Sequence, residues 1–384
     1  MTRDPADVVV VGGGVMGLAT AWELTRRGIR PLVLERFARG HRAGASHGAT
    51  RNFNNAYDEE HYLDLLVRSR EGWDALGRVG GEPLLRLHGL VTHGDVDIAS
   101  VRARLVERGI AAEVLTAADA SVRWPGMRFD DDVLWSADAG VVRAADALVE
   151  LERRVVAGGG EVRWSTPVAH IGEDSAGIIL DLADGGRLRA DTLVVTAGAW
   201  TAKLLGRLGL PRLTVTEETP AHFAPRTDAA WPSINHYVDP EAYPGTVYGM
   251  PTPGEGVKVG FHRVGDEADP DSRPHRPTHQ VALAEYVREW MPGLDPASGV
   301  PISCTYTSTD DGTFVLDRRG RIVVGAGFSG HGFKFATGIG AVLADLALDS
   351  KARAAEPFRL PAARGDGQRE RTTRLSSQTG ASDS

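Results

Sequence analysis

The chain of 384 residues contains a single cysteine, Cys304. One cysteine excludes an intramolecular disulfide and any metal site built from several thiolates. The 12 histidines are scattered along the chain, and none stands at metal-ligand spacing from a partner. We therefore expect no bound metal ion.

The sequence also lacks a long apolar run and an excess of basic residues. No stretch is long and apolar enough to span a bilayer, so we expect no membrane association. Lys and Arg number 43 against 51 Asp and Glu, and the net charge of −8 argues against a nucleic-acid surface. The apolar run that begins at Val8 leaves no room before it for a signal peptide, so the expected location is the cytoplasm.

A glycine motif near the N-terminus is typical of dinucleotide binding. Four valines, 8–11, lead into Gly12-Gly13-Gly14-Val15-Met16-Gly17, and a second strand pattern ends at Glu35. The first glycine permits a tight turn, the second admits a pyrophosphate, and the third lets the helix pack closely on the strand. Glu35 is placed to bind ribose hydroxyls. An acid there argues against a 2′-phosphate, although Arg36 beside it weakens that point. A glycine-rich turn without a nucleotide is the alternative.

The order of elements favours FAD over a nicotinamide cofactor. Helical patterns cover 58–79 and 144–157, and a strand follows at 161–164. A hairpin at 177–182 and 187–190 then precedes a buried strand at 192–195 that ends in the small turn 196–200. This order is typical of a flavin-binding domain, because nicotinamide-binding domains usually continue with further strand and helix repeats.

The remaining patterns indicate a second domain. Short strand patterns occupy 84–135 and 213–261, and another helix covers 281–291. We predict an α/β fold with a discontinuous, Rossmann-like FAD-binding domain of the glutathione-reductase type (1–82, 143–212 and 304–352). An antiparallel-sheet α+β substrate domain (83–142 and 213–303) would accompany it. Residues 353–384 are mostly polar and are expected to form a disordered tail.

The C-terminal block carries the most specific pattern. Cys304 precedes strand patterns at 313–316 and 322–325, and the glycine-rich run 325–335 follows. Together with 12–17, 46–51, 56–57, 196–200, 248–251 and 257–262, this block resembles the monomeric sarcosine oxidase and N-methyltryptophan oxidase family of D-amino-acid-oxidase-like flavoproteins. The resemblance covers most of the chain. It implies a monomeric enzyme that oxidises a small amine to an imine and reduces dioxygen to hydrogen peroxide.

The resemblance also implies roles for individual residues. The cysteine that matches Cys304 binds FAD covalently through a thioether, although a lone cysteine is otherwise more often a small buried residue. Lys258 matches an oxygen-activating lysine, and a solvated lysine is the alternative. Lys334 matches a lysine that binds the substrate carboxylate, and Arg51 matches an arginine close to the flavin. His262 matches an active-site histidine, or it is a hydrogen-bonded structural residue.

The expected catalytic residues are Lys258, Arg51, His262 and Lys334. Residues that contact the cofactor and residues that contact the substrate complete the expected site. The expected cofactor contacts are Gly12, Gly14, Val15, Met16, Gly17, Glu35, Arg36, Ser46, Thr50, Arg51, Val168, Cys304, Gly327, Gly330, Gly332, Phe333 and Lys334. The expected substrate contacts are Asn54, Tyr57, Tyr248, Tyr306 and Lys334. As aromatic residues, the three tyrosines could equally belong to the core.

Asn54 departs from the family pattern. The family has a second arginine three residues after the one that matches Arg51, and that side chain binds the substrate carboxylate with two hydrogen bonds. A neutral amide cannot replace this pair, so a small N-methyl amino acid should bind ~2 to 4 kcal/mol more weakly. We expect a substrate that is larger or less acidic than sarcosine, such as a cyclic or conjugated secondary amine of specialised metabolism.

Two other functions compete with an oxidase. A flavin dehydrogenase of the same fold would pass its electrons to a partner protein or another acceptor, and Lys258 argues against it. A noncatalytic flavin-binding module is disfavoured because Cys304, Lys258 and Lys334 occur together.

Overall fold

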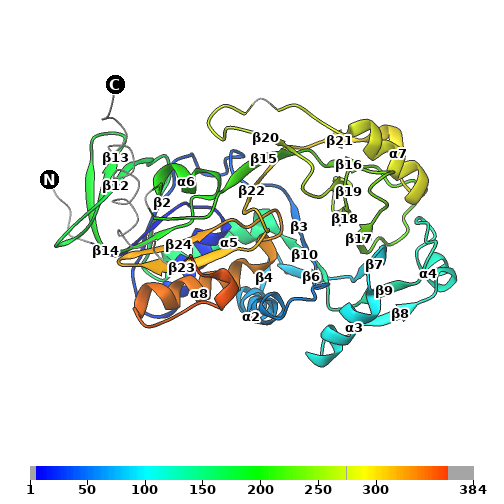
Figure 1. The fold of residues 1–384 in the computed structure, drawn as a ribbon, viewed down its shortest axis with the longest axis horizontal. Coiled ribbons are helices and arrows are strands. Elements are labelled where there is room, and N and C mark those ends of the chain that lie inside the picture. Colours follow the sequence, from blue (N-terminus) through cyan, green and yellow to red (C-terminus); the bar gives the residue numbers. More distant parts are fainter. Residues whose placement is uncertain (1–5, 207, 274, 362–384) are drawn as a thin grey trace, which may run out of the picture.

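The computed structural model describes residues 6–206, 208–273 and 275–361. A sheet with a parallel centre organises the part of the molecule on the left of Figure 1, which we call the first half. The strand order is β11 (Glu161–Arg163), β2 (Leu32–Leu34), β1 (Ala6–Val11), β14 (Arg187–Val195), β24 (Ile322–Ala326) and β23 (Val315–Arg319). All neighbours are parallel except β24 and β23. The antiparallel strands β12 (Val168–Asp174) and β13 (Gly177–Leu182) extend the sheet from the first part of β14.

Apolar residues on both faces explain why β1 is central. Val8 and Val10 belong to one buried cluster, whereas Val9 and Val11 belong to another. This alternation follows from side chains pointing to opposite faces of a strand, and burial on both faces is typical of parallel sheets. The residues 187–190 and 192–195, expected as separate strands, form the single strand β14, because its first part pairs with β13 and its second part with β24.

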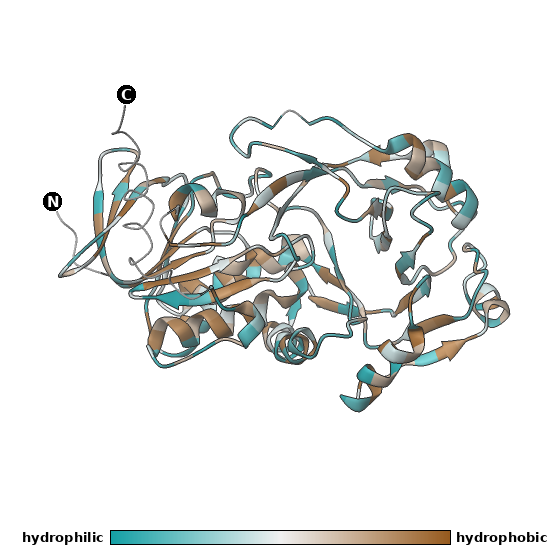
Figure 2. Cartoon of the chain, in the orientation of Figure 1, coloured by the Kyte–Doolittle hydropathy of each residue, from teal (hydrophilic) through white to brown (hydrophobic). Residues whose placement is uncertain are grey.

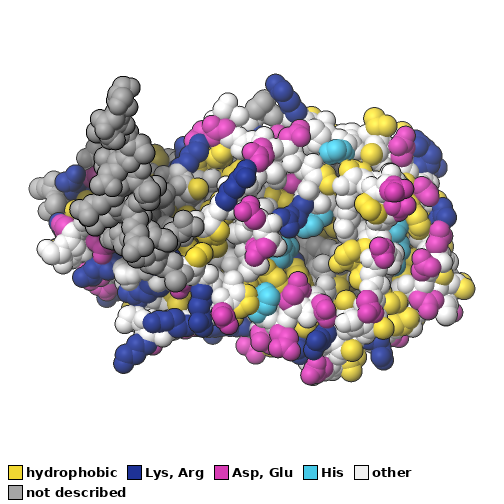
Figure 3. Space-filling view, in the orientation of Figure 1, with side chains coloured by type: hydrophobic (Ala, Val, Ile, Leu, Met, Phe, Trp, Pro, Cys, Tyr) yellow, Lys and Arg dark blue, Asp and Glu magenta, His cyan; other side chains and the backbone are white. Residues whose placement is uncertain are grey.

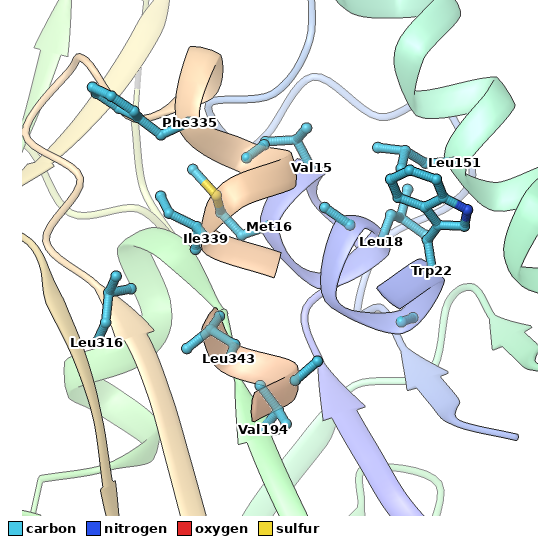
Figure 4. Close-up of a cluster of buried hydrophobic side chains, with 14 of the residues drawn as sticks. Val15, Met16, Leu18, Trp22, Leu151, Val194, Leu316, Phe335, Ile339 and Leu343 are labelled. Carbon is cyan, nitrogen blue, oxygen red and sulfur yellow. The ribbon is translucent and has the colours of Figure 1, made fainter. Parts of the chain in front are cut away.

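Four helices accompany this sheet: α1 (Val15–Arg26), α2 (Glu60–Leu76), α5 (Ala144–Ala157) and α8 (Ala336–Leu348). Figure 4 shows Val15, Met16, Leu18 and Trp22 of α1 in one cluster with Ile339 and Leu343 of α8. Apolar residues lie along the inner strands and helices (Figure 2). The helices predicted at 58–79 and 144–157 are confirmed as α2 and α5.

A second sheet organises the other half. Its order is β21 (Val300–Pro301), β16 (Ala221–Phe223), β19 (Gly256–Phe261), β18 (Val247–Thr252), β17 (Ser233–Tyr237), β7 (Leu90–Gly94), β9 (Val133–Ser136) and β8 (Glu113–Leu115). The predicted antiparallel sheet is confirmed with one exception, since β17 and β7 are parallel. Helix α7 (Gln280–Trp290) shares a buried cluster with this sheet, and α3 (Ile98–Glu107) and α4 (Ala117–Arg123) flank β8.

Smaller sheets lie between and beside the halves. One contains β3 (Thr50–Phe53), β10 (Gly140–Arg143) and β6 (Leu85–Leu87), and another contains β20 (Asp266–Glu267), β15 (Thr214–Glu218) and β22 (Cys304–Ser308). The short strands β4 (Arg78–Val79) and β5 (Glu82–Pro83) pair with each other, and α6 (Thr201–Leu204) is a further short helix. The strands of the large parallel-centred sheet come from 1–82, 143–212 and 304–352, and those of the second sheet from 83–142 and 213–303.

The chain is still packed beyond position 353, where the tail was expected to begin. Ala354, Phe358 and Leu360 are buried, and the Phe358 ring stacks on Phe314 with centroids 5.9 Å apart. The Leu360 amide donates to Asp317 Oδ2 at 2.9 Å. The start at 353 was therefore wrong, because three apolar residues in a polar stretch anchor it to the first half. Residues 362–384 of the expected tail lie outside the described residues. No helix among the residues described is long and apolar enough to cross a membrane.

Candidate active site

A cavity of about 2000 Å³ lies between the two halves. It extends from the turn between β1 and α1 to β18 and β19 in the other half and to β22 of a smaller sheet, and the loop 328–334 lines it as well. Figure 3 shows a recess near the centre of this face, with histidine side chains beside it. Ligand pockets for drug-sized molecules are commonly about 300 to 1,000 Å³, so this cavity can hold a larger ligand.

The three motif glycines have the geometry that dinucleotide binding requires. Gly12 has φ +110°, and a Cβ on Gly17 would lie 1.8 Å from the Gly12 carbonyl oxygen. A Cβ on Gly14 would meet only Ser46 Oγ, at 3.1 Å. The first and third glycines therefore permit the turn and the close packing of α1, while a side chain at the second would crowd Ser46 at the start of the helix. Ser46 Oγ accepts a hydrogen bond from the Val15 amide there, at 3.0 Å.

Glu35 follows the last residue of β2 and faces this turn. Its Oε2 accepts from the Gly13 amide at 2.7 Å, and its Oε1 accepts from the Phe37 amide at 3.0 Å. These bonds hold a buried carboxylate on the cavity wall, where it can face a ribose. Arg36, next to it, lies over the Phe37 and Trp200 rings and pairs with Asp271 at 3.0 Å. A segment of the second half therefore reaches the nucleotide end of the cavity.

Lys258 lies in β19, with its side chain 5% exposed. Its Nζ donates to the Thr50 carbonyl oxygen at 3.1 Å, and the Arg51 guanidinium donates to the same oxygen at 2.9 Å. Burial, with the charge of Arg51 as the second cause, lowers the pKa of Lys258 to about 7. The lysine can therefore gain or lose a proton near neutral pH.

Among the described residues, the hydrogen-bond partners of the Arg51 guanidinium are backbone oxygens. Its guanidinium donates to the carbonyls of Ala45, at 2.8 Å, and of His47, in addition to that of Thr50. It also lies 5.7 Å from the centroid of the Phe333 ring. Since none of these partners carries a charge, the positive charge of Arg51 remains available to a ligand in the cavity.

Lys334 is a second buried lysine on the cavity wall, 4% exposed. Its Nζ donates to the His331 carbonyl oxygen at 2.9 Å and lies over the Tyr57 and Phe335 rings, 5.1 and 4.9 Å from their centroids. Burial lowers the pKa of Lys334 to about 7. An anionic ligand group would favour its charged form.

His262 and two tyrosines form the wall near β22. His262 Nδ1 and the Tyr306 hydroxyl are 3.4 Å apart, and the Tyr248 ring lies 6.5 Å from that of His262. Burial first, and then the charge of Lys334, lowers the pKa of His262 to about 4, so the ring is neutral at pH 7. Gly330, with φ +82°, lets its backbone approach Tyr306, because a Cβ there would lie 2.1 Å from the Tyr306 ring.

Cys304 begins β22 and lines the same cavity. Within the part of the chain that the structure describes, its thiol has one contact within hydrogen-bonding distance, the Thr305 carbonyl oxygen at 3.9 Å. The residue is only partly buried, so the interpretation of Cys304 as a small core residue does not hold. The thiol is free to react with a group in the cavity.

The cavity brings together most of the predicted residues. Three expected cofactor contacts, Gly17, Thr50 and Gly327, are not on its wall. Gly17 packs against Gly12, the Thr50 hydroxyl bonds to that of Thr252 at 2.8 Å, and Gly327 faces Thr309. Their effect is therefore indirect, and that of Thr50 is to orient Lys258 through its carbonyl. The other predicted cofactor and substrate contacts line the cavity: Gly12, Gly14, Val15, Met16, Glu35, Arg36, Ser46, Arg51, Asn54, Tyr57, Val168, Tyr248, Cys304, Tyr306, Gly330, Gly332, Phe333 and Lys334.

Among the wall residues without a predicted role, two polar ones stand out. His331 bonds to the Tyr57 hydroxyl through Nδ1 at 3.0 Å, and Arg273 reaches the cavity with a buried Nη1 that has no hydrogen-bond partner among the described residues. His331 stands inside the glycine-rich run, which was the one signal for it. Arg273 lies in a segment without a motif, so the sequence carried no signal.

The residues present fit a dinucleotide with a redox ring. The glycine turn without side chains at 12–14, the carboxylate of Glu35 and the start of α1 suit the nucleotide and its pyrophosphate. The far end of the same cavity presents a thiol and two buried lysines, which suit a flavin and a reacting ligand. These two ends belong to one continuous cavity, as FAD requires.

Comparison with known proteins agrees with this fit. The family model described as FAD dependent oxidoreductase matches residues 7–346. Monomeric sarcosine oxidase of Bacillus sp. (strain B-0618) is 29% identical over 362 residues, covering 90% of this chain and 93% of the relative. Peroxisomal sarcosine oxidase of Homo sapiens is 32% identical over 373 residues, with the same coverage. Among solved structures, the open form of NikD, an amino acid oxidase essential for nikkomycin biosynthesis, superimposes with a TM-score of 0.83 at 27% identity, covering 94% of this chain and 99% of that one.

Proposed function

We propose, given that this chain belongs to the family of FAD-dependent oxidoreductases, that it oxidises a secondary or N-methyl amine with dioxygen as the electron acceptor. The chain is an FAD-dependent oxidoreductase acting on CH–NH donors, like its sarcosine oxidase relatives. The amine loses two electrons and two protons and becomes an imine, and dioxygen gains them and becomes hydrogen peroxide. When bound, FAD supplies the redox chemistry of both half-reactions.

The observation that carries this proposal is the pair of buried lysines in one cavity with the glycine motif. Lys258 Nζ is fixed by the Thr50 carbonyl and removed from solvent. A fixed cation in a dry site stabilises developing negative charge far more than a solvated one does. We assign Lys258 to the activation of dioxygen on this basis.

The other residues position the amine and hold charge. Lys334 would bind an acidic or carbonyl group of the substrate, and the neutral His262 can accept a hydrogen bond from the amine N–H. The uncompensated charge of Arg51 would stabilise an electron-rich ring in the cavity. All four side chains line the cavity.

Cys304 is our proposed point of covalent attachment of FAD. Cys304 is partly exposed and lines the same cavity as the two buried lysines. A thioether would retain the cofactor in a cavity that is open to solvent at its rim.

Asn54 supports a substrate other than sarcosine. Its Oδ1 accepts a hydrogen bond from the Ala56 amide at 2.8 Å, which leaves Nδ2 as the group that can donate to a ligand. A neutral amide group replaces the two charge-assisted hydrogen bonds that an arginine would provide. A larger or less acidic amine of specialised metabolism would depend less on this position. We further propose that the enzyme is a cytoplasmic monomer with small-molecule partners alone.

A dehydrogenase that delivers electrons to another acceptor is the second candidate. Solved structures similar to this chain include L-proline dehydrogenase of P. horikoshii, but at 18% identity this similarity concerns the fold alone. Lys258 favours the oxidase because an electron-transferring enzyme has no need of a buried cation for dioxygen.

An anaerobic amine screen tests the proposal. The purified protein is mixed with secondary and N-methyl amines without oxygen, and the flavin absorbance band is followed. We expect a cyclic or conjugated secondary amine to bleach the band and sarcosine to bleach it poorly. Admission of oxygen should then restore the band with one hydrogen peroxide per amine oxidised. Bleaching by no amine would contradict amine oxidation, and restoration without peroxide would favour the dehydrogenase.

A further inference from the structure

One residue, His331, holds both Tyr57 and Lys334 at the edge of the cavity. Its carbonyl oxygen accepts from Lys334 Nζ at 2.9 Å, and its Nδ1 lies 3.0 Å from the Tyr57 hydroxyl. Lys334 Nζ in turn lies 5.1 Å from the centroid of the Tyr57 ring. The two groups that a ligand would meet here are therefore oriented by the same residue.

The surroundings of His331 determine which of its nitrogens carries the proton. Nε2 lies 3.5 Å from the Gly312 carbonyl oxygen, which can only accept a hydrogen bond. Burial, and next the charge of Lys334, lowers the pKa of His331 well below its usual value, so the ring is neutral. A neutral ring with its proton on Nε2 has a lone pair on Nδ1. The Tyr57 hydroxyl must therefore donate to Nδ1.

Packing prevents the ring from reversing this arrangement. The His331 ring lies 4.6 Å from the Phe314 ring and 5.2 Å from the Tyr62 ring, measured between centroids. The Tyr62 hydroxyl donates to the same Gly312 carbonyl, at 3.4 Å. A rotated ring would lose the bonds to Tyr57 and Gly312 together.

The consequence for Tyr57 is a fixed polarity. A phenol has one hydrogen, and once that hydrogen is committed to His331 only oxygen lone pairs can face a ligand. Lys334 beside it offers hydrogens and no lone pair while it is charged. A plain carboxylate satisfies Lys334 but brings its own lone pairs against those of Tyr57.

We propose that His331 is a positioning residue that fixes Tyr57 as a hydrogen-bond acceptor, so that the site selects amines carrying an N–H or O–H donor beside an acidic group. This inference rests on the proposed function, and it names the substrate class of that site. A heteroaromatic N–H next to a carboxylate has this chemistry. A simple aliphatic N-methyl amino acid has no such second donor.

A matched pair of non-reacting ligands tests the inference on the FAD-loaded protein. Indole-2-carboxylate has an N–H beside its carboxylate, and benzofuran-2-carboxylate has a ring oxygen in the same place. Binding of each is measured from the change in the flavin absorbance spectrum. Indole-2-carboxylate can make one neutral hydrogen bond to Tyr57 that benzofuran-2-carboxylate cannot, and benzofuran-2-carboxylate also leaves that acceptor unsatisfied. Indole-2-carboxylate should therefore bind at least about tenfold more tightly.

Three variants separate positioning from a merely structural role. His331→Phe frees the Tyr57 hydroxyl to donate, and Tyr57→Phe removes the acceptor, so each should reduce the preference to about twofold or less. His331→Asn places an amide oxygen near the position of Nδ1 and should restore the preference. As a control, the flavin spectrum of each variant without ligand should match that of the wild type, which would show that the site is intact.

Several outcomes would overturn the inference. Tighter binding of benzofuran-2-carboxylate, binding of neither ligand, or an unchanged preference in both His331→Phe and Tyr57→Phe would each do so. These measurements involve no turnover. Failure of the amine screen would therefore leave the ligand preference intact, and loss of the preference would leave amine oxidation standing.

Discussion

The charge on Lys258 should control how fast the reduced enzyme reacts with dioxygen. The lysine is 5% exposed, and burial together with Arg51 lowers its pKa to about 7. Above the pKa the fraction of ammonium falls about tenfold per pH unit. Negative charge on a reduced ring nearby would favour the ammonium form of Lys258, so the decrease of this form would occur at higher pH. We expect reoxidation to be fast at pH 6 and to decline by about tenfold per unit beyond the pKa.

The magnitude for removal of the charge follows from Coulomb's law. Two unit charges 4 Å apart interact by about 4 kcal/mol at an effective dielectric constant of 20, which corresponds to about a thousandfold in rate. Lys258→Met should therefore slow reoxidation by between about 10² and 10³, and its rate should no longer depend on pH in this range. Lys258→Arg should also remove the pH dependence while retaining charge, since a guanidinium stays protonated.

The assay separates the two half-reactions. The enzyme is reduced with dithionite without oxygen and mixed with oxygenated buffer from pH 6 to 10, and the return of the flavin band is timed. Lys334→Met is the matched control, because Lys334 is equally buried and its pKa is also about 7. It should weaken ligand binding and leave reoxidation unchanged. A wild-type rate that is independent of pH, or an equal loss in both variants, would refute the reasoning.

Three further predictions concern the cofactor, the substrate and stability. Cys304→Ala should leave FAD extractable by acid, whereas the wild-type precipitate should stay yellow; a colourless wild-type precipitate would contradict covalent attachment. Asn54→Arg should tighten sarcosine binding by ~2 to 4 kcal/mol, measured as the sarcosine concentration that half-saturates flavin reduction, and no gain would show that the pocket differs for other reasons. Burial lowers the pKa of His236 to about 4 in the folded protein, so its contribution to stability is complete above pH 6.5 and is lost as the pH falls toward 4. Between pH 8 and pH 5 the wild-type free energy of unfolding should fall by about 2 kcal/mol more than that of His236→Asn, and equal losses in urea titrations would contradict this.

Several features of this protein could be predicted from the sequence because neighbouring residues determine them. The valine run, the glycines at 12, 14 and 17 and the acid at 35 predict a strand, a turn and a helix, which are formed as β1, α1 and β2. Helix α5 has the predicted bounds, because its apolar spacing and the glycines after it are local signals. The family resemblance then placed Lys258, Lys334 and Cys304 in one site, and all three line the cavity.

Tertiary contacts decided what a local pattern cannot encode. The parallel pairing of β7 with β17 joins 90–94 to 233–237, and the docking of Phe358 joins the C-terminal region to residues near 62 and 314. Spacing along the chain carries no information about partners so distant in sequence.

The same limit applies to the chemistry of the site. The sequence by itself determined which side chains were available there, but only the folded structure decided their states. The pKa of Lys258 depends on burial beneath Thr50 and on Arg51, and the polarity of Tyr57 depends on a proton that Gly312 holds on the far side of the His331 ring. Charge and proton position are set by distance and solvent exposure, and these exist only once the distant segments of the chain have packed together.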